Sequence, residues 1–168
     1  QPSAVEAVVA GHVCLDMLPA LDERHRGKAL AVPGDLTTVG PLTVVPGGAV
    51  ANTGLGLAEL GVAVRLMGAV GEDAVGRLTL DALGSRNPSL IEDMIVLPEA
   101  RSSYCVVLQA PGADRAFLAF TGVNDVYSAD HVPYDRLRGV RLFHFGYPTL
   151  MRSMTVDGGR PLADMFAR

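Results

Sequence analysis

The sequence predicts an α/β fold, in which helices flank a mostly parallel sheet and a small separate β-sheet forms a lid. Apolar, strand-like runs alternate with helical segments and short connections between residues 5 and 97. A hairpin pattern interrupts this alternation at residues 103–120. With 168 residues, of which 49% are apolar, the chain is long enough to build one hydrophobic core.

The first apolar run predicts a buried strand with a carboxylate at its end. Residues 5–15 (VEAVVAGHVCL) are rich in β-branched side chains and too short for a typical helix. Gly11 and Asp16 bracket the end of this strand. Open α/β sheets bind ligands outside the carboxyl ends of their strands, so Asp16 is a candidate ligand contact. A turn or helix-cap role for this Asp is an equally weighted alternative.

The next segment is predicted to be peripheral. Residues 18–40 are polar and predict a loop, and residues 36–45 (LTTVGPLTVV) predict a strand at the edge of a sheet. Gly40 and Pro41 interrupt the β-branched run, which a central strand does not tolerate.

A diglycine then leads into a helix predicted over residues 49–60, which ends at Gly61. Gly47 and Gly48 allow the backbone to approach a ligand closely, and Asn52 lies on the first turn of the helix, where amide groups are free. These residues are candidate contacts for an anion or for a ligand rich in hydroxyls. A flexible connection to the helix is the alternative role of the diglycine.

Two further strands and a helix complete the alternation. Residues 62–70 and 91–97 predict buried strands, and the helix between them ends near Leu83. Asp73 is well placed to cap this helix, with Val75, Leu78, Ala82 and Leu83 on its inward face. Short connections between these elements favour parallel strands that are covered on both faces.

The hairpin pairs residues 103–109 with residues 115–120. Together with the peripheral strand it predicts a lid formed from two inserts, at residues 34–46 and 101–121. After the lid, Asn124 and Asp125 either contact a ligand or form a turn. Residues 140–145 predict another strand, and a final helix begins at Pro161.

Composition excludes several classes of function. A net charge of −4 gives no basic surface for nucleic acid. No apolar run approaches the length of a membrane span, and we expect a cytoplasmic protein. Cys14 and Cys105 are predicted to be buried free thiols, and the spacing of the histidines predicts no metal site.

These residues resemble the first half of the ribokinase, or PfkB, family of carbohydrate kinases. That family's first signature starts with a diglycine, has an Asn four residues beyond the second Gly, and closes with G-x-D-x-x-G. The matching residues are Gly47, Gly48, Asn52, Gly71, Asp73 and Gly76. Gly11 and Asp16 also match a strand-end G-x-x-x-x-D motif of the family, and the predicted lid is similar to the family's β-lid.

The resemblance implies that residues 1–168 are the N-terminal part of a ribokinase-like kinase domain whose C-terminal part is absent from this chain. It also implies that Asp16 and Asn52 hydrogen-bond sugar hydroxyls, and that Gly47 and Gly48 lie beside the sugar and act as a hinge for the lid. Asn124 is the remaining candidate for substrate binding. The implied partner is a small-molecule sugar or nucleoside, and lid strands of this type also mediate homodimers.

One part of the family pattern is missing. The second signature, D-T-x-G-A-G-D, supplies the anion hole and the catalytic Asp, and the sequence contains no such stretch. We therefore assign no catalytic residue in this chain. The implied activity of the complete enzyme is transfer of the ATP γ-phosphoryl group to a hydroxymethyl oxygen, with Mg²⁺ as cofactor. The alternative is a non-catalytic sugar- or nucleoside-binding module, or a truncated remnant.

Overall fold

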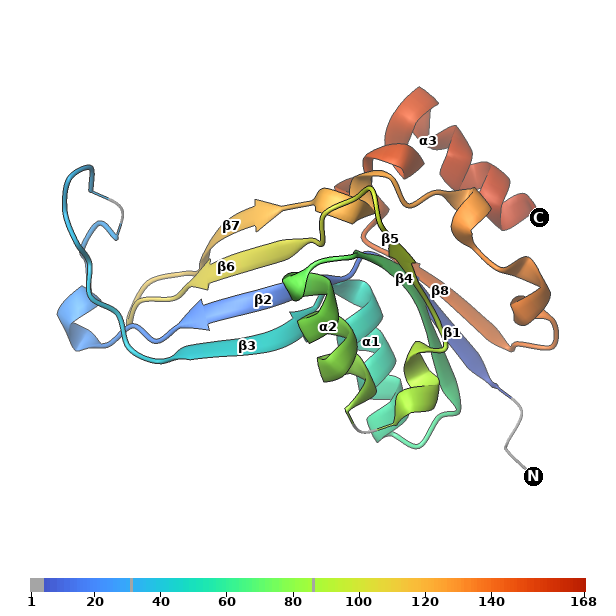
Figure 1. The fold of residues 1–168 in the computed structure, drawn as a ribbon, viewed down its shortest axis with the longest axis horizontal. Coiled ribbons are helices and arrows are strands. Elements are labelled where there is room, and N and C mark those ends of the chain that lie inside the picture. The colour runs from blue at the N-terminus through green and yellow to red at the C-terminus, as the bar shows by residue number, and fades with distance from the viewer. Residues whose placement is uncertain (1–4, 31, 86) are drawn as a thin grey trace.

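The fold consists of a body built on one sheet and a second sheet that projects from it (Figure 1). A computed structural model describes residues 5–30, 32–85 and 87–168. The main sheet has the order β5-β4-β1-β8, and all its strands are parallel. Its strands are β1 (Ala7–Gly11), β4 (Val64–Gly71), β5 (Asp93–Leu97) and β8 (Leu142–Gly146).

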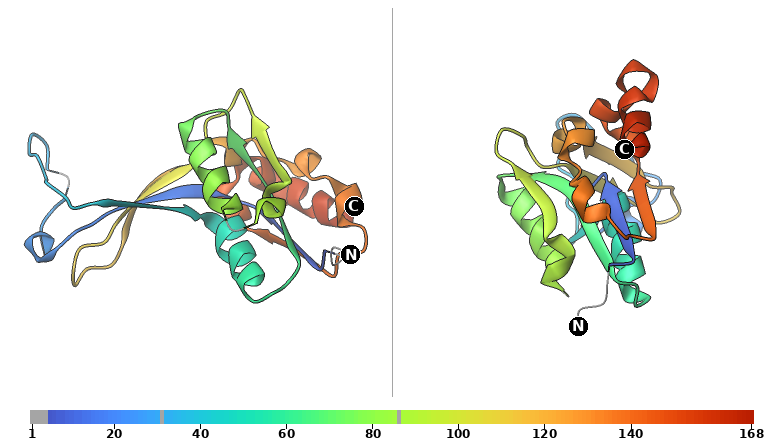
Figure 2. Two further views of the ribbon diagram at one scale, coloured as in Figure 1. Left: turned by 60° about the horizontal axis from the view of Figure 1, so that its bottom comes forward. Right: turned by 90° about the vertical axis from the view of Figure 1, so that its right-hand side faces the viewer.

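The projecting sheet has the order β3-β2-β6-β7. It consists of β2 (Cys14–Pro19), β3 (Leu42–Gly47), β6 (Tyr104–Leu108) and β7 (Ala116–Phe120). Strands β2 and β6 are parallel, whereas β3 and β7 run antiparallel to their neighbours. Its strands extend away from the body as an arm that is long and narrow in two views (Figure 2).

Helices cover both faces of the main sheet. Helices α1 (Gly48–Glu59) and α2 (Ala74–Gly84) lie on one face, and α3 (Arg152–Ala167) lies on the other (Figure 1). Short 3-10 helices connect the remaining elements: η1 (Glu23–His25), η2 (Pro88–Ile91), η3 (Gly122–Asp125), η4 (Ala129–His131), η5 (Tyr134–Leu137) and η6 (Pro148–Leu150).

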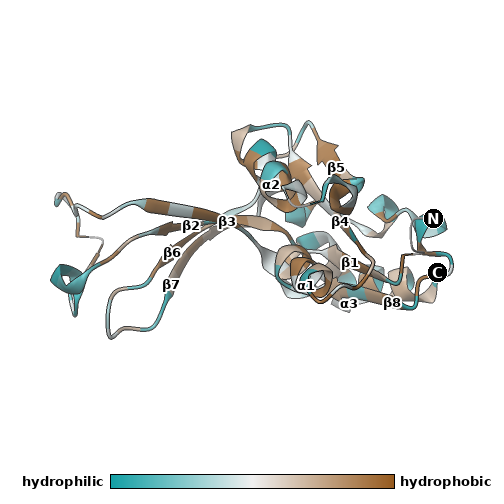
Figure 3. Cartoon of the chain, turned by 90° about the horizontal axis from the view of Figure 1, so that it is seen from below, coloured by the Kyte–Doolittle hydropathy of each residue, from teal (hydrophilic) through white to brown (hydrophobic). Residues whose placement is uncertain are grey.

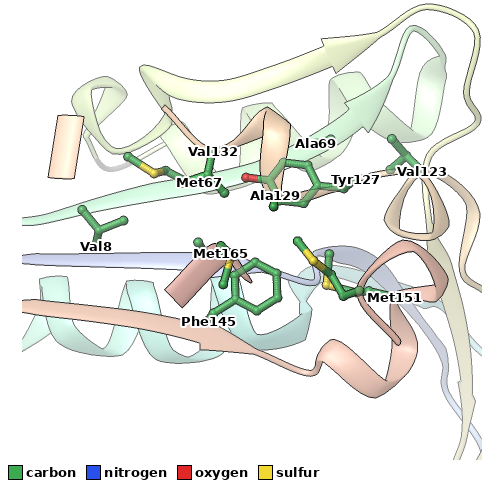
Figure 4. Packing of buried hydrophobic residues seen from close by; sticks show 12 residues of the cluster. Val8, Met67, Ala69, Val123, Tyr127, Ala129, Val132, Phe145, Met151 and Met165 are labelled. Atoms are coloured by element: carbon green, nitrogen blue, oxygen red, sulfur yellow. The ribbon is translucent and has the colours of Figure 1, made fainter. Parts of the chain in front are cut away.

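The core has one apolar cluster on each face of the main sheet. On the α1 and α2 face, Val9 and Leu66 pack against Val50 and Leu83, and all four are fully buried. On the α3 face, Met67, Tyr127, Phe145 and Met151 gather in the same space (Figure 4). Burial of such side chains stabilises the fold by about 1.5–3 kcal/mol each, and the two clusters together fix the three-layer body.

The first predicted strand is in fact two strands in two different sheets. The prediction placed residues 5–15 in one strand, but the chain leaves the main sheet after Gly11 and enters the projecting sheet at Cys14. Gly11 makes the change of direction with a φ of +112°, which a residue with a side chain rarely adopts. The apolar run continues across the break because both sides of it are buried.

Most other predicted elements are present with shifts of a few residues at their ends. The final helix differs more, because α3 begins at Arg152 and not at Pro161, and its backbone is non-helical at residues 156–159. The hairpin is confirmed as β6 and β7, and the strand predicted at residues 36–45 is β3, which starts after Pro41. The inward face of α2 differs from the prediction, because Thr79 and Leu83 are buried while Leu78 is 51% exposed. Within the residues that the structure describes, no helix is long and apolar enough to cross a membrane.

Candidate functional site

The candidate site lies where the chain crosses from the body into the projecting sheet. His12 and Val13 join β1 to β2. Both the N–H and the carbonyl of the His12 backbone form hydrogen bonds. Its N–H donates to the Gly146 carbonyl at 3.2 Å, and its carbonyl accepts from the Val50 N–H at 3.1 Å. The crossover is therefore tied to the end of β8 and to the first turn of α1.

Asn124 fixes the second residue of this crossover. Its Oδ1 accepts from the Val13 N–H at 3.2 Å, and its Nδ2 donates to the Val13 carbonyl at 2.8 Å. The residue is fully buried. The side-chain amide thus pairs with backbone groups in place of a strand neighbour. Asn124 is therefore enclosed in this structure, and its observed contacts hold the crossover in shape.

Asp16 lies on β2 of the projecting sheet and not at the end of a main-sheet strand. This corrects the predicted position, and the cause is the break in the first strand. Asp16 is half-buried, with Val45 of β3 and Cys105 of β6 as its neighbours across the sheet. The Cys14 thiol donates to its Oδ1 at 3.3 Å.

The two cysteines are free and buried, as predicted. Burial raises the pKa of the Cys14 thiol well above its usual range, and the charge of Asp16 and the hydrogen bond to it act in the same direction. Burial also raises the pKa of the Cys105 thiol, again with a contribution from Asp16. Both thiols therefore stay protonated beside the carboxylate at neutral pH.

The diglycine separates two polar side chains. Gly47 ends β3 and is the N-cap residue of α1, and Gly48 begins the helix with a φ of +82°. A Cβ on Gly47 would collide with the Asp16 carboxylate. A Cβ on Gly48 would lie 2.6 Å from His12 Nδ1. A side chain at either glycine would enter space that the carboxylate or the imidazole occupies in this structure.

Asn52 lies on the same side of α1 as Gly48, one turn further along. Residues four apart on a helix have side chains about 5–6 Å from one another. Asn52 is exposed, and its amide has no hydrogen-bond partner among the described residues. The structure therefore brings Asp16 next to the diglycine at the start of α1, and Asn52 is exposed on the same helix.

His12 is a polar residue of this region that belongs to none of the sequence motifs. It is only 6% exposed, and its ring lies 6.0 Å from that of Tyr147. Burial lowers the pKa of His12, and the carboxylates of Asp16 and Asp125 oppose that shift. The imidazole is consequently neutral at pH 7. In the sequence, this residue could have been noticed as a polar imidazole within the otherwise apolar run of residues 7–15.

The site contains hydrogen-bonding groups but no arrangement for a metal. Among the residues with described positions, no three His, Cys, Asp or Glu side chains are grouped to hold a metal ion. An ionised Asp accepts hydrogen bonds only, whereas Asn both donates and accepts. Such a set suits neighbouring hydroxyls on a small ligand.

Comparison with known proteins places this chain in a family. Residues 6–149 match the pfkB family of carbohydrate kinases. The chain is 28% identical over 108 residues to a protein described as a chloroplastic fructokinase of Arabidopsis thaliana, a match covering 63% of this chain and 28% of that protein.

Solved structures show the same fold. Arabidopsis thaliana ribokinase, complexed with ribose and ATP, superposes with a TM-score of 0.69 at 20% identity, covering 84% of this chain and 45% of that one. A Burkholderia thailandensis nucleoside kinase in complex with inosine gives a TM-score of 0.60 at 19% identity, with coverage of 82% and 43%.

The chain belongs to the pfkB family of carbohydrate kinases and has the ribokinase-like α/β fold. It spans less than half the length of these relatives.

Proposed function

We propose that this chain is the acceptor-binding portion of an ATP-dependent kinase that phosphorylates a hydroxymethyl group of a sugar or nucleoside. The observation that carries the proposal is the meeting of the Asp16 carboxylate, the diglycine and the first turn of α1 beside Asn52. The family match supports the reaction class, and the ribose and inosine complexes of the two solved relatives support the acceptor classes.

Each residue has a distinct part in this proposal. Asp16 accepts hydrogen bonds from two neighbouring hydroxyls, and Asn52 adds a donor and an acceptor. Gly47 and Gly48 leave room for the sugar and allow the backbone to pivot. Asn124 acts indirectly, by holding Val13 and thereby the start of β2.

The projecting sheet acts as the lid in this account. Asp16 is part of that sheet, so a movement of the sheet carries the carboxylate with it. Closure over a bound acceptor would exclude water from the reacting hydroxyl, as lids commonly do. Strand β2 pairs with both lid inserts, with β3 on one side and β6 on the other, although the prediction had placed only residues 34–46 and 101–121 in the lid.

ATP and Mg²⁺ are expected for the complete enzyme, with their sites mostly outside this chain. The described residues contain no acidic cluster for a metal ion, and the sequence has neither the second family signature nor a phosphate-binding lysine loop. When bound, ATP provides the phosphoryl group. The residues of this chain bind and orient the hydroxyl that receives it.

The lid also provides a surface for a second copy of the chain. Its strands carry exposed apolar side chains, including Leu42 at 56%, Phe117 at 55% and Leu118 at 60% exposed. Apolar segments run along the arm (Figure 3). We propose that a homodimer forms through these residues, because apolar strands of this kind pair readily.

An assay of the complete protein tests the proposed function. ATP and Mg²⁺ are supplied with ribose, fructose or inosine, and phosphorylated product is measured together with acceptor affinity. We expect one acceptor to be phosphorylated, and Asp16→Asn to weaken its binding by about 1–3 kcal/mol. Asp114→Asn, an exposed carboxylate in the β6–β7 loop of the same sheet, is the control and should leave binding unchanged.

A second candidate is a binding module without catalysis. It is favoured by the lack of the second family signature in this sequence. Binding of an acceptor that is insensitive to ATP, with no product formed by the complete protein, would establish this second candidate and refute the kinase.

A further inference from the structure

The His12 Nδ1 atom is buried and has neither a hydrogen bond nor an ion pair among the described residues. Asp93 Oδ2, the other buried atom there without a hydrogen-bond partner, forms an ion pair with Arg65 Nε at 3.0 Å. Buried polar atoms nearly always have a hydrogen-bond partner. Among the described residues, His12 Nδ1 is enclosed and has none. An apolar side chain of similar size would fill the same space without the free-energy cost of burying an unpaired nitrogen. The stability of the fold therefore does not explain a histidine at this position.

The position of the imidazole connects it to the acceptor site. Gly48 covers Nδ1, since a Cβ on that residue would lie 2.6 Å from the nitrogen. A Cβ on Gly47 would likewise collide with the Asp16 carboxylate. Gly47 thus lies against Asp16 and Gly48 lies against His12, so the two polar side chains are on either side of the diglycine.

The connections of the lid meet at this same point. One connection passes through His12 and Val13, and another passes through Gly47 and Gly48. The His12 carbonyl is fixed by the Val50 N–H, so the imidazole stays with the body. A pivot at the diglycine therefore changes how Gly48 covers Nδ1 while the ring itself remains in place.

A neutral imidazole matches the chemistry of a hydroxyl. One ring nitrogen carries a proton and the other accepts one. A hydroxyl both donates and accepts, so it pairs with Nδ1 in either tautomer. A group that is unpaired in the free protein and becomes paired in the complex contributes to affinity.

We propose that His12 is a second polar contact for the acceptor, whose Nδ1 hydrogen-bonds an acceptor hydroxyl when the diglycine pivots. This inference rests on the proposed function and adds one residue to it. Asp16 holds the acceptor from the lid side, and His12 holds it from the body side. Selection among acceptors then depends on which one places a hydroxyl at Nδ1.

The test uses His12→Leu and His12→Asn in the complete protein. Calorimetry with ribose, fructose and inosine gives affinities, and thermal unfolding without acceptor gives stability. We expect His12→Leu to bind about tenfold more weakly while unfolding at the same or a higher temperature. His12→Asn, which keeps a polar atom near the Nδ1 position, should retain most of the affinity.

A matched control is provided by His131. Its Nδ1 is paired with the N–H of Ser128 at 2.9 Å, and its ring stacks on Tyr127 at 5.5 Å. His131→Leu should therefore lower the unfolding temperature without changing acceptor affinity, the reverse of the result for His12→Leu.

The outcomes separate the inference from the function on which it rests. Unchanged acceptor affinity in His12→Leu, or a loss of stability equal to that of His131→Leu, overturns the role of His12 and leaves the kinase intact. Failure of the wild-type protein to bind any of the three acceptors overturns the proposed function, and the inference with it.

Discussion

At the scale of single residues, the two glycines of the diglycine impose different constraints. Gly47 has an extended backbone, with a φ of −127°, so a side chain there causes no backbone strain. Only the mobile end of Asp16 stands in its way. Gly48 has a φ of +82°, and a Cβ there would also lie 2.6 Å from the His12 carbonyl oxygen, which is fixed by Val50.

Alanine substitutions should separate these two constraints. Gly47→Ala is expected to leave stability almost unchanged but to weaken acceptor binding, because the carboxylate must rotate away. Gly48→Ala should lower the free energy of unfolding by about 1–3 kcal/mol. Urea unfolding and calorimetry measure both effects.

Gly56 provides the control for this pair, because no atom lies within 4 Å of a Cβ at that position of α1. Gly56→Ala should raise stability by about 0.5–1 kcal/mol. Equal loss of stability in the Gly47 and Gly48 variants would show that the diglycine is required for the fold alone.

The protonated state of Cys14 can be tested by its reactivity. Burial and the adjacent Asp16 raise the pKa of this thiol, and the thiolate is the reactive form. We expect iodoacetamide at about pH 8 to leave Cys14 unmodified in the native protein and to modify it in urea, as read by peptide mass spectrometry. Modification of native Cys14 at the rate seen in urea would contradict the buried carboxylate–thiol contact.

At the scale of elements, Asp73 joins a helix to the lid. Its Oδ1 accepts from the Gly76 N–H at 2.8 Å and caps α2. Its Oδ2 accepts from the Ser102 N–H at 2.9 Å, just before β6. One carboxylate thus fixes both the start of α2 and the point where the chain enters the projecting sheet.

Removal of this carboxylate should destabilise the protein. Asp73→Ala loses a helix cap and leaves the Ser102 N–H unpaired, so we expect a decrease of about 1–3 kcal/mol in the free energy of unfolding. Asp81→Ala, at an exposed position of the same helix, serves as the control and should change stability little. Equal effects of the two substitutions in urea unfolding would refute the capping role.

The same carboxylate predicts a dependence on pH. Burial raises the pKa of Asp73, but the hydrogen bonds from Ser102 and Gly76 outweigh it and hold the pKa below its usual value. An unfolded Asp titrates near about pH 4, so the ionised group stabilises the fold fully above that pH. The stabilisation is lost as the pH falls through the lowered native pKa.

The stability difference between wild type and Asp73→Asn should therefore shrink on acidification from neutral pH to about pH 3, as measured by urea unfolding at each pH. A difference that grows on acidification would contradict this sign.

Elements with local signals were predicted well, and those set by tertiary contacts were not. The cap at Asp73, the stop at Gly61 and the turn of the hairpin are each encoded by neighbouring residues, and the structure has all of them. The break after Gly11 was missed because hydrophobicity continues across it. The pairing of Asn124 with Val13 joins residues 111 positions apart, so no local pattern reveals it.

At the scale of the whole molecule, the part of the main sheet that the structure describes has two edge strands. In the order β5-β4-β1-β8, strands β5 and β8 each have one neighbour, and Leu142 of β8 is 49% exposed. The relatives are more than twice as long as the matched region. We expect the 168-residue chain by itself to associate through these edges and through the apolar lid.

The isolated chain should also lack transferase activity, because the second family signature is missing from its sequence. Sedimentation analysis and an ATP-consumption assay with ribose, fructose and inosine measure both properties. Phosphorylation of an acceptor by this chain alone would show that the catalytic group lies within it.

The central claim is that Asp16 of the projecting sheet and Asn52 of α1 bind one acceptor from two sides of the diglycine. A crystal structure of the complete protein with its acceptor tests this most directly. We expect acceptor hydroxyls within hydrogen-bond distance of both the Asp16 carboxylate and the Asn52 amide. An acceptor bound elsewhere, or held with packed side chains between these two residues, would contradict it.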